Sequence, residues 1–207
     1  TTNWSFAWTP SVQGTITIKS RAFDDTGNLE PTGSGEGSPN VITVNVTAPA
    51  APTCPCSIFG PLTVGNEEND SGAVELGVKF RSDITGYITG IRFYKTAGNI
   101  GTHTGTLWSS AGANLATATF SGESSSGWQE VLFDTPVAVT ANTTYVASYH
   151  TTSGHYATGT SFAAAGVDNT PLHALQDGFD GPNGVYVYGG GGVFPTTTYA
   201  SSNYLVD

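Results

Sequence analysis

The sequence contains no methionine and very few basic residues. Its 207 residues include 6 Lys and Arg against 16 Asp and Glu, which gives a formal net charge of -10 with histidine neutral. Proteins that bind nucleic acids need clusters of Lys and Arg to neutralise phosphates. We therefore expect no nucleic-acid partner, and the same scarcity of basic side chains argues against binding to an anionic membrane surface.

Long apolar runs are also missing from the sequence. No stretch approaches the ~20 consecutive apolar residues that a helix needs to cross a bilayer, so we expect no membrane insertion. The first residues, 1–4, include neither a start methionine nor the pattern of a signal peptide. We expect the chain to be an internal piece of a longer polypeptide.

Charged residues make up only 11% of the chain, whereas glycine is abundant, with 27 residues. Threonine and serine are also frequent, and this composition is typical of a secreted β-protein. With 38% hydrophobic and 11% aromatic residues, the sequence can still form a packed core. We therefore expect a secreted or cell-surface location.

The sequence has two cysteines, Cys54 and Cys56, separated by one proline. Two are too few for a disulfide-rich scaffold or for a zinc site with four cysteine ligands. Their spacing also differs from the Cys-x-x-Cys motif of redox enzymes. A local disulfide and a pair of free thiols are both open, and we favour a structural disulfide.

The first part of the chain predicts three β-strands, because apolar and polar residues alternate over residues 4–8, 15–23 and 41–46. The run Arg21–Glu30 resembles the hairpin before the final strand of bacterial immunoglobulin-like or fibronectin-type domains. That resemblance covers residues 1–47. It implies the C-terminal part of such a sandwich, because a complete one needs ~100 residues.

Residues 48–53 are rich in proline and alanine and predict a short extended linker. Beyond it, residues 54–207 form alternating segments separated by glycine, asparagine and serine turns. This pattern predicts an all-β chain whose second part is an antiparallel β-sandwich of the jelly-roll type. The predicted strands are Val74–Arg81, Tyr87–Lys95, Thr104–Trp108, Leu115–Phe120, Gln129–Phe133, Thr144–His150, Val185–Tyr188 and Tyr204–Val206.

The second part of the chain also contains a series of short motifs, which are Val74–Phe80, Gly86–Lys95, Gly101–Ser109, Gly127–Gln129, Thr143–His150, Asn183–Gly189 and Phe194–Pro195. In this order they resemble a bacterial domain family of unknown function, over almost all of residues 54–207. The resemblance implies a jelly-roll-like module of large secreted proteins. Such modules occur beside immunoglobulin-like, PKD and fibronectin modules, and sometimes beside carbohydrate-active enzymes. The resemblance assigns no reaction.

Asp177, Asp180 and Asn183 carry side-chain oxygens at three-residue intervals, and a glycine follows each of them. Calcium binds six to eight oxygens, with backbone carbonyls and water completing the set, so this loop is a candidate Ca²⁺ site. The alternative is that these side chains only make turn hydrogen bonds to nearby backbone amides. The acidic residues within 67–70 are another candidate.

No arrangement of residues in the sequence indicates catalysis. There is no Gly-x-Ser-x-Gly motif, and no pattern pairs two carboxylates for glycosidase chemistry. The 4 histidines lack the close pairs that are typical of zinc sites. We therefore interpret the protein as non-enzymatic, with no catalytic residues.

Aromatic residues fall into two groups. Those on predicted strands belong to the core by default, together with Leu107. Sugar rings stack on aromatic side chains and form hydrogen bonds with polar ones, so aromatic residues near the C-terminus indicate a ligand-binding surface. The alternative is that these tyrosines only brace the sheet edge. The expected core residues are Phe80, Phe93, Leu107, Phe120 and Phe133, and the candidate ligand-binding residues are His150, His155, Tyr156, Asn183, Tyr186, Tyr188, Phe194 and Tyr199.

These observations favour a non-catalytic carbohydrate-binding or adhesion module of a larger secreted or cell-surface bacterial protein. Its expected partner is a polysaccharide or surface glycan. The alternative is structural: neighbouring copies of the chain would complete the partial immunoglobulin-like domain by strand addition and build an extracellular fibre or stalk. An enzyme is the third and least favoured interpretation.

Overall fold

The structure is a computed structural model that describes residues 7, 8, 10, 12–20, 40–47, 53–70 and 72–207. The chain divides into two units, Thr1–Ala51 and Pro52–Asp207. Most of the predicted strand 4–8, the run Arg21–Glu30 and nearly all of the linker 48–53 lie outside the described residues.

The described part of the first unit contains an antiparallel pair of strands, β1 (Gly14–Ser20) and β2 (Asn40–Val46). The pairing runs from Gly14 opposite Val46 to Ser20 opposite Asn40. Both strands fall where alternation predicts them, because β-branched residues recur along each. Ile18, Val41 and Ile42 are exposed on this hairpin.

The second unit is built from short and medium strands. The described residues include no helix long and apolar enough to cross a membrane. Its strands are β3 (Asn66–Asn69), β4 (Val74–Ser82), β5 (Gly86–Lys95), β6 (Thr104–Ser109), β7 (Asn114–Thr119), β8 (Gly127–Val139), β9 (Tyr145–Thr151), β10 (His155–Thr158), β11 (Val167–Asn169), β12 (Leu172–Ala174), β13 (Val185–Tyr188) and β14 (Thr197–Thr198).

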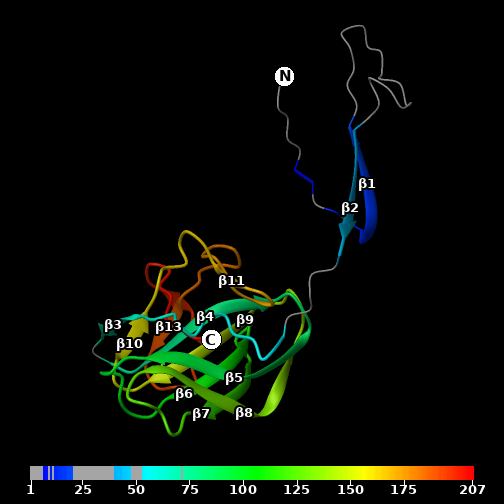
Figure 1. Cartoon of the computed structure of the whole chain (residues 1–207). Helices are drawn as coiled ribbons and strands as arrows, with labels where there is room; N and C mark the ends of the chain where they lie inside the picture. The colour runs from blue at the N-terminus through cyan, green and yellow to red at the C-terminus, as the bar shows by residue number, and fades with distance from the viewer. Residues whose placement is uncertain (1–6, 9, 11, 21–39, 48–52, 71) are drawn as a thin grey trace. The chain divides into compact units, whose positions relative to one another are not determined.

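The named strands of the second unit pair antiparallel (Figure 1). The largest sheet has the order β11-β12-β4-β9-β6-β7, and β13 pairs with both β4 and β14. The strands β5 and β8 pair with each other, as do β3 and β10. The predicted all-β class and antiparallel β-sandwich are confirmed.

The core of the second unit lies between the large sheet and the β5–β8 pair. The ring of Phe93 on β5 stacks on Tyr149 of β9, with 4.2 Å between ring centroids, and meets the edge of Phe120 at 4.9 Å. Every residue that the sequence assigns to the core is buried: Phe80, Phe93, Leu107, Phe120 and Phe133.

The other face of the large sheet carries a smaller apolar cluster. Trp108, Val146 and Val185 are buried there, and Phe194 packs against them. Residues on β4 alternate between the two faces, so Leu76 joins the main core whereas Glu75 lies on the side of this second cluster.

The predicted strand Tyr204–Val206 is only partly extended. Val206 forms an isolated bridge with Phe93, and the amide of Tyr94 donates to the carbonyl of Leu205 at 3.0 Å. Leu205 has φ of 51°, in the left-handed region, and this interrupts a regular strand. The sequence also failed to predict β3, β10, β11, β12 and β14, which have at most four residues each.

Candidate functional site

A cavity of about 460 Å³ lies at one end of the second unit, and we call it the tyrosine pocket. Its walls come from β3, β4, β10, β13 and the C-terminal segment. The lining residues are Glu68, Asp70, Val74, Leu76, Tyr156, Thr158, Gly159, Ser161, Tyr186, Tyr188, Tyr199, Ala200, Ser202 and Tyr204.

The pairing of β13 with β4 sets one wall of the tyrosine pocket. Tyr186 lies opposite Leu76, and Tyr188 lies opposite Val74. Residues opposite each other in a strand pair project to the same face, so both tyrosines continue the face that Leu76 and Val74 present to the core. The predicted common face of Tyr186 and Tyr188 agrees with their ring centroids, which lie 5.4 Å apart.

Asp70 joins three strands at the pocket. It directly follows β3, and its Oδ2 accepts hydrogen bonds from the hydroxyls of Tyr156 at 2.9 Å and Tyr188 at 2.7 Å. Tyr156 belongs to β10 and Tyr188 to β13. One carboxylate oxygen therefore fixes the positions of two aromatic rings from different strands.

The tyrosine rings meet one another at steep angles. The ring of Tyr186 is inclined by 72° to Tyr188 and by 78° to Tyr204, and Tyr204 is inclined by 76° to Tyr156. Neighbouring rings at nearly right angles expose their faces in different directions. The side chains therefore form the walls of a hollow rather than a flat stack.

The rings differ in their access to solvent. Tyr199 is 72% exposed and Tyr188 is 54% exposed, whereas Tyr204 is buried. Tyr156 and Tyr186 are half-buried. A ligand would therefore contact Tyr188 and Tyr199 first. The buried Tyr204 lies deeper in the pocket.

Hydrogen bonding and burial favour the neutral form of three phenols in the pocket. The hydrogen bond to Asp70 is the largest cause that raises the pKa of Tyr188, to about 12. Burial raises the pKa of Tyr156 and of Tyr204. These three phenols therefore keep their protons. Tyr156 and Tyr188 donate theirs to Asp70, so their oxygens are left as acceptors for a ligand.

The charge of the pocket is negative. Glu68 and Asp70 are its ionisable residues besides the tyrosines, and the described lining includes no Lys, Arg or His. Glu68 accepts a hydrogen bond from the hydroxyl of Thr158 at 3.0 Å. The pocket therefore combines aromatic surface, hydroxyl groups and two carboxylates.

Three candidate ligand-binding residues lie away from the pocket. His155 points to the other side of β10, where its Nδ1 lies 2.9 Å from Glu67 Oε1. His150 is buried, with its Nε2 3.0 Å from the carbonyl oxygen of Gly189. Phe194 packs on Trp108, with ring centroids 5.6 Å apart. These three side chains pack or form hydrogen bonds within the protein.

Asn183 is also absent from the pocket, and it is fully buried. Its Oδ1 accepts from the amides of Lys79 at 2.8 Å and Gly184 at 2.7 Å. Its Nδ2 donates to the carbonyls of Lys79 at 3.0 Å and Leu175 at 2.7 Å. The side-chain amide thus acts as a brace between β4 and the loop before β13.

The two aspartates of the candidate calcium loop also form hydrogen bonds within the protein. Asp177 accepts from the amide of Asn183 at 2.8 Å. Asp180 accepts from the hydroxyl of Thr144 and from Arg81 at 3.2 Å, and the Thr144 contact is the largest cause that lowers its pKa. Among the described residues, no group of three or more His, Cys, Asp or Glu could hold a metal. Calcium binding at this loop stays a prediction.

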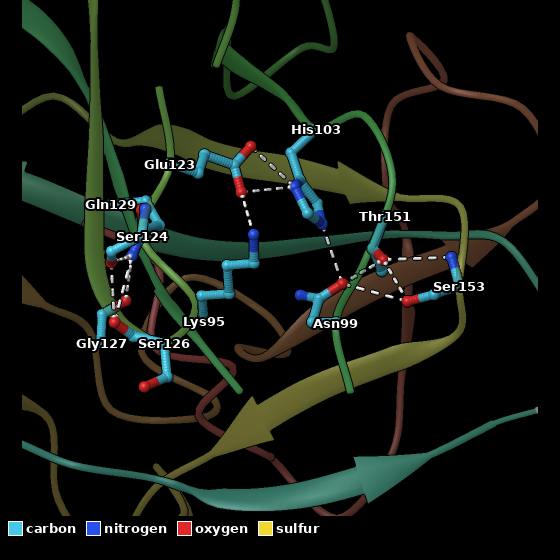
Figure 2. Close-up of polar contacts among 10 residues, drawn as sticks. All are labelled: Lys95, Asn99, His103, Glu123, Ser124, Ser126, Gly127, Gln129, Thr151 and Ser153. Carbon is cyan, nitrogen blue, oxygen red and sulfur yellow. Dashed lines mark hydrogen bonds and ion pairs between the residues drawn. The ribbon is translucent and has the colours of Figure 1, made fainter. Parts of the chain in front are cut away.

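A second polar cluster surrounds the buried His103 (Figure 2). Its Nδ1 lies 2.9 Å from Oε1 of Glu123, and Oε2 of the same carboxylate accepts from Lys95 at 2.7 Å. Its Nε2 lies 2.8 Å from Oδ1 of Asn99. Burial lowers the pKa of His103, so the ring is predominantly neutral at pH 7. None of these residues lines the tyrosine pocket.

Cys54 and Cys56 are joined by a disulfide near the start of the second unit. The bond closes a small loop around the intervening proline, and the two cysteines do not line the tyrosine pocket.

The sequence located part of the tyrosine pocket. Four residues that the sequence assigns to a ligand-binding surface line it, namely Tyr156, Tyr186, Tyr188 and Tyr199, and their role in binding stays a prediction. The sequence indicates Glu68 and Asp70 only as candidate metal ligands, and Tyr204 only as part of a strand. The available signal was the cluster of carboxylates just before the first long strand.

The fold and the pocket together define an antiparallel β-sandwich domain with a tyrosine-lined, acidic pocket. A domain of unknown function, DUF4082, matches residues 62–206. The match spans most of the chain, and the chain belongs to this family. No curated protein and no solved structure matches the chain significantly.

Proposed function

We propose that the second unit is a non-catalytic carbohydrate-binding module of a larger secreted or cell-surface bacterial protein, and that the tyrosine pocket is its binding site. The observation that carries this proposal is the convergence of five tyrosines and two carboxylates on one cavity of about 460 Å³. The volume lies in the range of small-ligand pockets.

The chemistry of the pocket suits a sugar ring. One face of a pyranose is lined by C–H groups, which pack on an aromatic ring, and its hydroxyls both donate and accept hydrogen bonds. Tyrosine provides a large contact area at low conformational cost, because it has few rotatable bonds. Asp70 holds Tyr156 and Tyr188 in place before a ligand arrives, which reduces the ordering cost of binding.

The same contacts support a binding role without catalysis. Asp70 Oδ2 accepts two tyrosine hydroxyls, so this oxygen is engaged in holding the rings. Retaining and inverting glycosidases instead place two carboxylates across the scissile bond as acid and base or nucleophile. A secreted location is supported by the disulfide between Cys54 and Cys56, because disulfides persist in oxidising compartments.

Affinity electrophoresis against a panel of soluble polysaccharides tests the proposal. We expect retention of the wild-type chain on at least one of them, and roughly tenfold weaker binding for Tyr199→Ala and Tyr186→Ala, since each loses a stacking surface. Tyr87→Ala is the matched control, because Tyr87 is 70% exposed but does not line the pocket.

The polysaccharide recovered from the gel should keep its chain length, which separates binding from hydrolysis. Absence of retention on every polysaccharide, with a protein that melts cooperatively, would overturn the proposal. An equal loss for Tyr87→Ala and Tyr199→Ala would show that binding does not take place in the tyrosine pocket.

A second candidate function is assembly into an extracellular fibre through the first unit. It is favoured by Ile18, Val41 and Ile42, which are exposed on the β1–β2 hairpin. Strands that expose apolar residues can be covered by a strand from another copy of the chain. Light scattering during size-exclusion chromatography tests this candidate. A monomer at all concentrations would overturn it.

A further inference from the structure

We infer that the tyrosine pocket selects saccharides that carry a protonated amine, in preference to neutral or acidic ones. This inference rests on the proposed function, because it names the class of glycan that the pocket accepts. It follows from three features of the pocket: the arrangement of its rings, its charge, and the partners of its carboxylates.

The aromatic rings that line the pocket lie at steep angles to one another. The Tyr156–Tyr204, Tyr204–Tyr186 and Tyr186–Tyr188 pairs have interplanar angles of 76°, 78° and 72°, so consecutive rings form walls at nearly right angles. The face of an aromatic ring carries partial negative charge, so a ring face that is accessible in the pocket attracts an ammonium group. The hydroxyls of Tyr156 and Tyr188 donate to Asp70, so their oxygens remain as acceptors for an ammonium group.

The charge of the pocket points to the same ligand. Glu68 and Asp70 lie in the lining, and the described lining has no Lys, Arg or His to balance them. An anionic sugar would meet both carboxylates without a cationic partner. A sugar with an ammonium group would supply the positive charge that the pocket lacks.

The partners of these two carboxylates differ from those of three other acidic residues in the same unit. Asp180, Glu123 and Asp207 each form an ion pair, with Arg81, Lys95 and Arg92 respectively. In the described structure, the side-chain contacts of Asp70 and Glu68 are with hydroxyls, from Tyr156, Tyr188 and Thr158. These hydroxyls orient the carboxylates but leave their negative charge uncompensated.

The net charge of the chain adds a longer-range contribution. With a formal charge of -10, the protein attracts cationic polymers and repels anionic ones, and this attraction is screened by salt. A polymer of glucosamine combines the required groups, because each ring offers an apolar face and an ammonium. Its N-acetylated counterpart has the same ring without the charge.

Isothermal titration calorimetry with the glucosamine hexamer and the N-acetylglucosamine hexamer tests the inference. At about pH 6 the amines are largely protonated, and we expect the glucosamine hexamer to bind about tenfold more tightly. This difference should shrink when the ionic strength rises from about 0.05 M to about 0.5 M.

Two variants assign the selectivity to the pocket. In Asp70→Asn the side chain keeps an oxygen that can accept the hydroxyls of Tyr156 and Tyr188 but loses its charge. Glu68→Gln removes the charge from an exposed side chain, so it should not affect folding. In both variants the ratio of the two affinities should fall towards one, because the carboxylate charge that favours the ammonium is gone.

The matched control is Glu67→Gln. Glu67 lies next to Glu68 on β3 but contacts His155 and the amide of Gly98 outside the pocket. It changes the net charge by the same amount, so it should keep the preference. If Glu67→Gln and Glu68→Gln lose the preference for the glucosamine hexamer equally, only the overall charge matters. That result would overturn the assignment of the selectivity to the pocket.

The remaining outcomes separate the inference from the proposed function. If the two hexamers bind equally, or the N-acetylated one binds more tightly, the inference is wrong and the carbohydrate-binding function stands. The same holds if both hexamers fail to bind while a neutral polysaccharide is retained in electrophoresis. Failure of every saccharide in both assays would overturn the two together.

Discussion

The carboxylate of Glu75 accepts a hydrogen bond from the hydroxyl of Ser148, and both residues are fully buried on the outer face of the large sheet. The other carboxylate oxygen accepts from the amide of Gly192 at 3.3 Å. Burial is the largest influence on Glu75 and raises its pKa, although Ser148, Gly192 and the neighbouring His150 oppose this effect. An ionisable group in this position costs stability whenever it is charged.

Glu75→Gln should therefore stabilise the second unit at neutral and alkaline pH. The pKa of Glu75 is higher in the folded state than its ordinary value of 4.5, so the folded state holds the proton more tightly. The stability that this group contributes is complete below about pH 4.5 and is lost as the pH rises through the folded pKa. Glutamine does not titrate and keeps an oxygen for Ser148.

Urea unfolding of the wild type and Glu75→Gln between about pH 4 and pH 8 measures this difference. The advantage of the variant should grow as the pH rises. A difference in unfolding free energy that stays constant across this range would contradict the prediction, because it would show that Glu75 does not titrate differently on folding.

The sequence predicted the elements that repeat a pattern over many residues. The segments that became β4, β5, β6, β7 and β9 alternate clearly. The apolar residues of β4 and β6 are buried, whereas Tyr87 on β5 and Leu115 on β7 are exposed. The strands β3 and β10 have only four residues and are mostly polar, so they carry no periodic signal. Because Asp70 follows β3, this omission also hid the carboxylate that holds the tyrosines.

The sequence could not separate buried polar residues from exposed ones. Asn183 and His150 look like sugar-binding groups by residue type, but both are buried and form hydrogen bonds within the protein. Phe194 follows a run of glycines, and such a run is typical of an exposed loop. Its contact with Trp108 comes from a segment far away in the sequence. Only Tyr186 and Tyr188 could be placed together by period alone.

The polar cluster around His103 predicts a pH-dependent contribution to stability (Figure 2). Burial lowers the pKa of His103 below its ordinary value of 6.5, although Glu123 opposes this effect. As the pH falls below about 6.5, the unfolded state takes up a proton more readily than the folded state, so stability is lost. His103→Gln removes this titration and keeps a donor for Glu123.

Chemical unfolding at about pH 7.5 and about pH 5.5 tests the role of His103. Relative to His103→Gln, the wild type should be less stable at the lower pH than at the higher one. His173→Gln is a control with the opposite sign. Burial lowers the pKa of His173, but Asp168 and Asp83 outweigh it and leave the pKa raised. The unfolding free energy of the wild type should therefore rise relative to that of His173→Gln as the pH falls. Parallel changes in the two variants would contradict both assignments.

Asn183→Ala should strongly destabilise the second unit. It removes four hydrogen bonds to the backbone, from Lys79, Leu175 and Gly184, and leaves buried amide and carbonyl groups without partners. We expect a loss of about 3 kcal/mol or more in unfolding free energy.

Asn183→Asp retains the two accepted hydrogen bonds but not the two donated ones, so its loss should also be large. Asn114→Ala is the control, since Asn114 is exposed and donates to Thr117 within the same strand. A loss for Asn183→Ala as small as that for Asn114→Ala would show that Asn183 does not brace β4.

Phe194 and Tyr199 should have opposite effects, although the sequence assigns both to ligand binding. Phe194→Ala removes the ring that covers Trp108 and lies 2.9 Å from the position that a Cβ atom at Gly112 would take, so it should lower the unfolding free energy by about 1–3 kcal/mol. Tyr199 is 72% exposed, and Tyr199→Ala should leave stability within about 0.5 kcal/mol while weakening saccharide binding.

Urea unfolding and affinity electrophoresis on the same preparations separate the two roles. Phe179→Ala is the matched control for stability, because Phe179 is exposed and its ring lies against the guanidinium of Arg81, which is 5.0 Å from the ring centroid. Phe179→Ala should lower the unfolding free energy by less than Phe194→Ala does. If Phe194→Ala weakens saccharide binding as much as Tyr199→Ala at full stability, the ligand extends beyond the tyrosine pocket to the loop that follows β13.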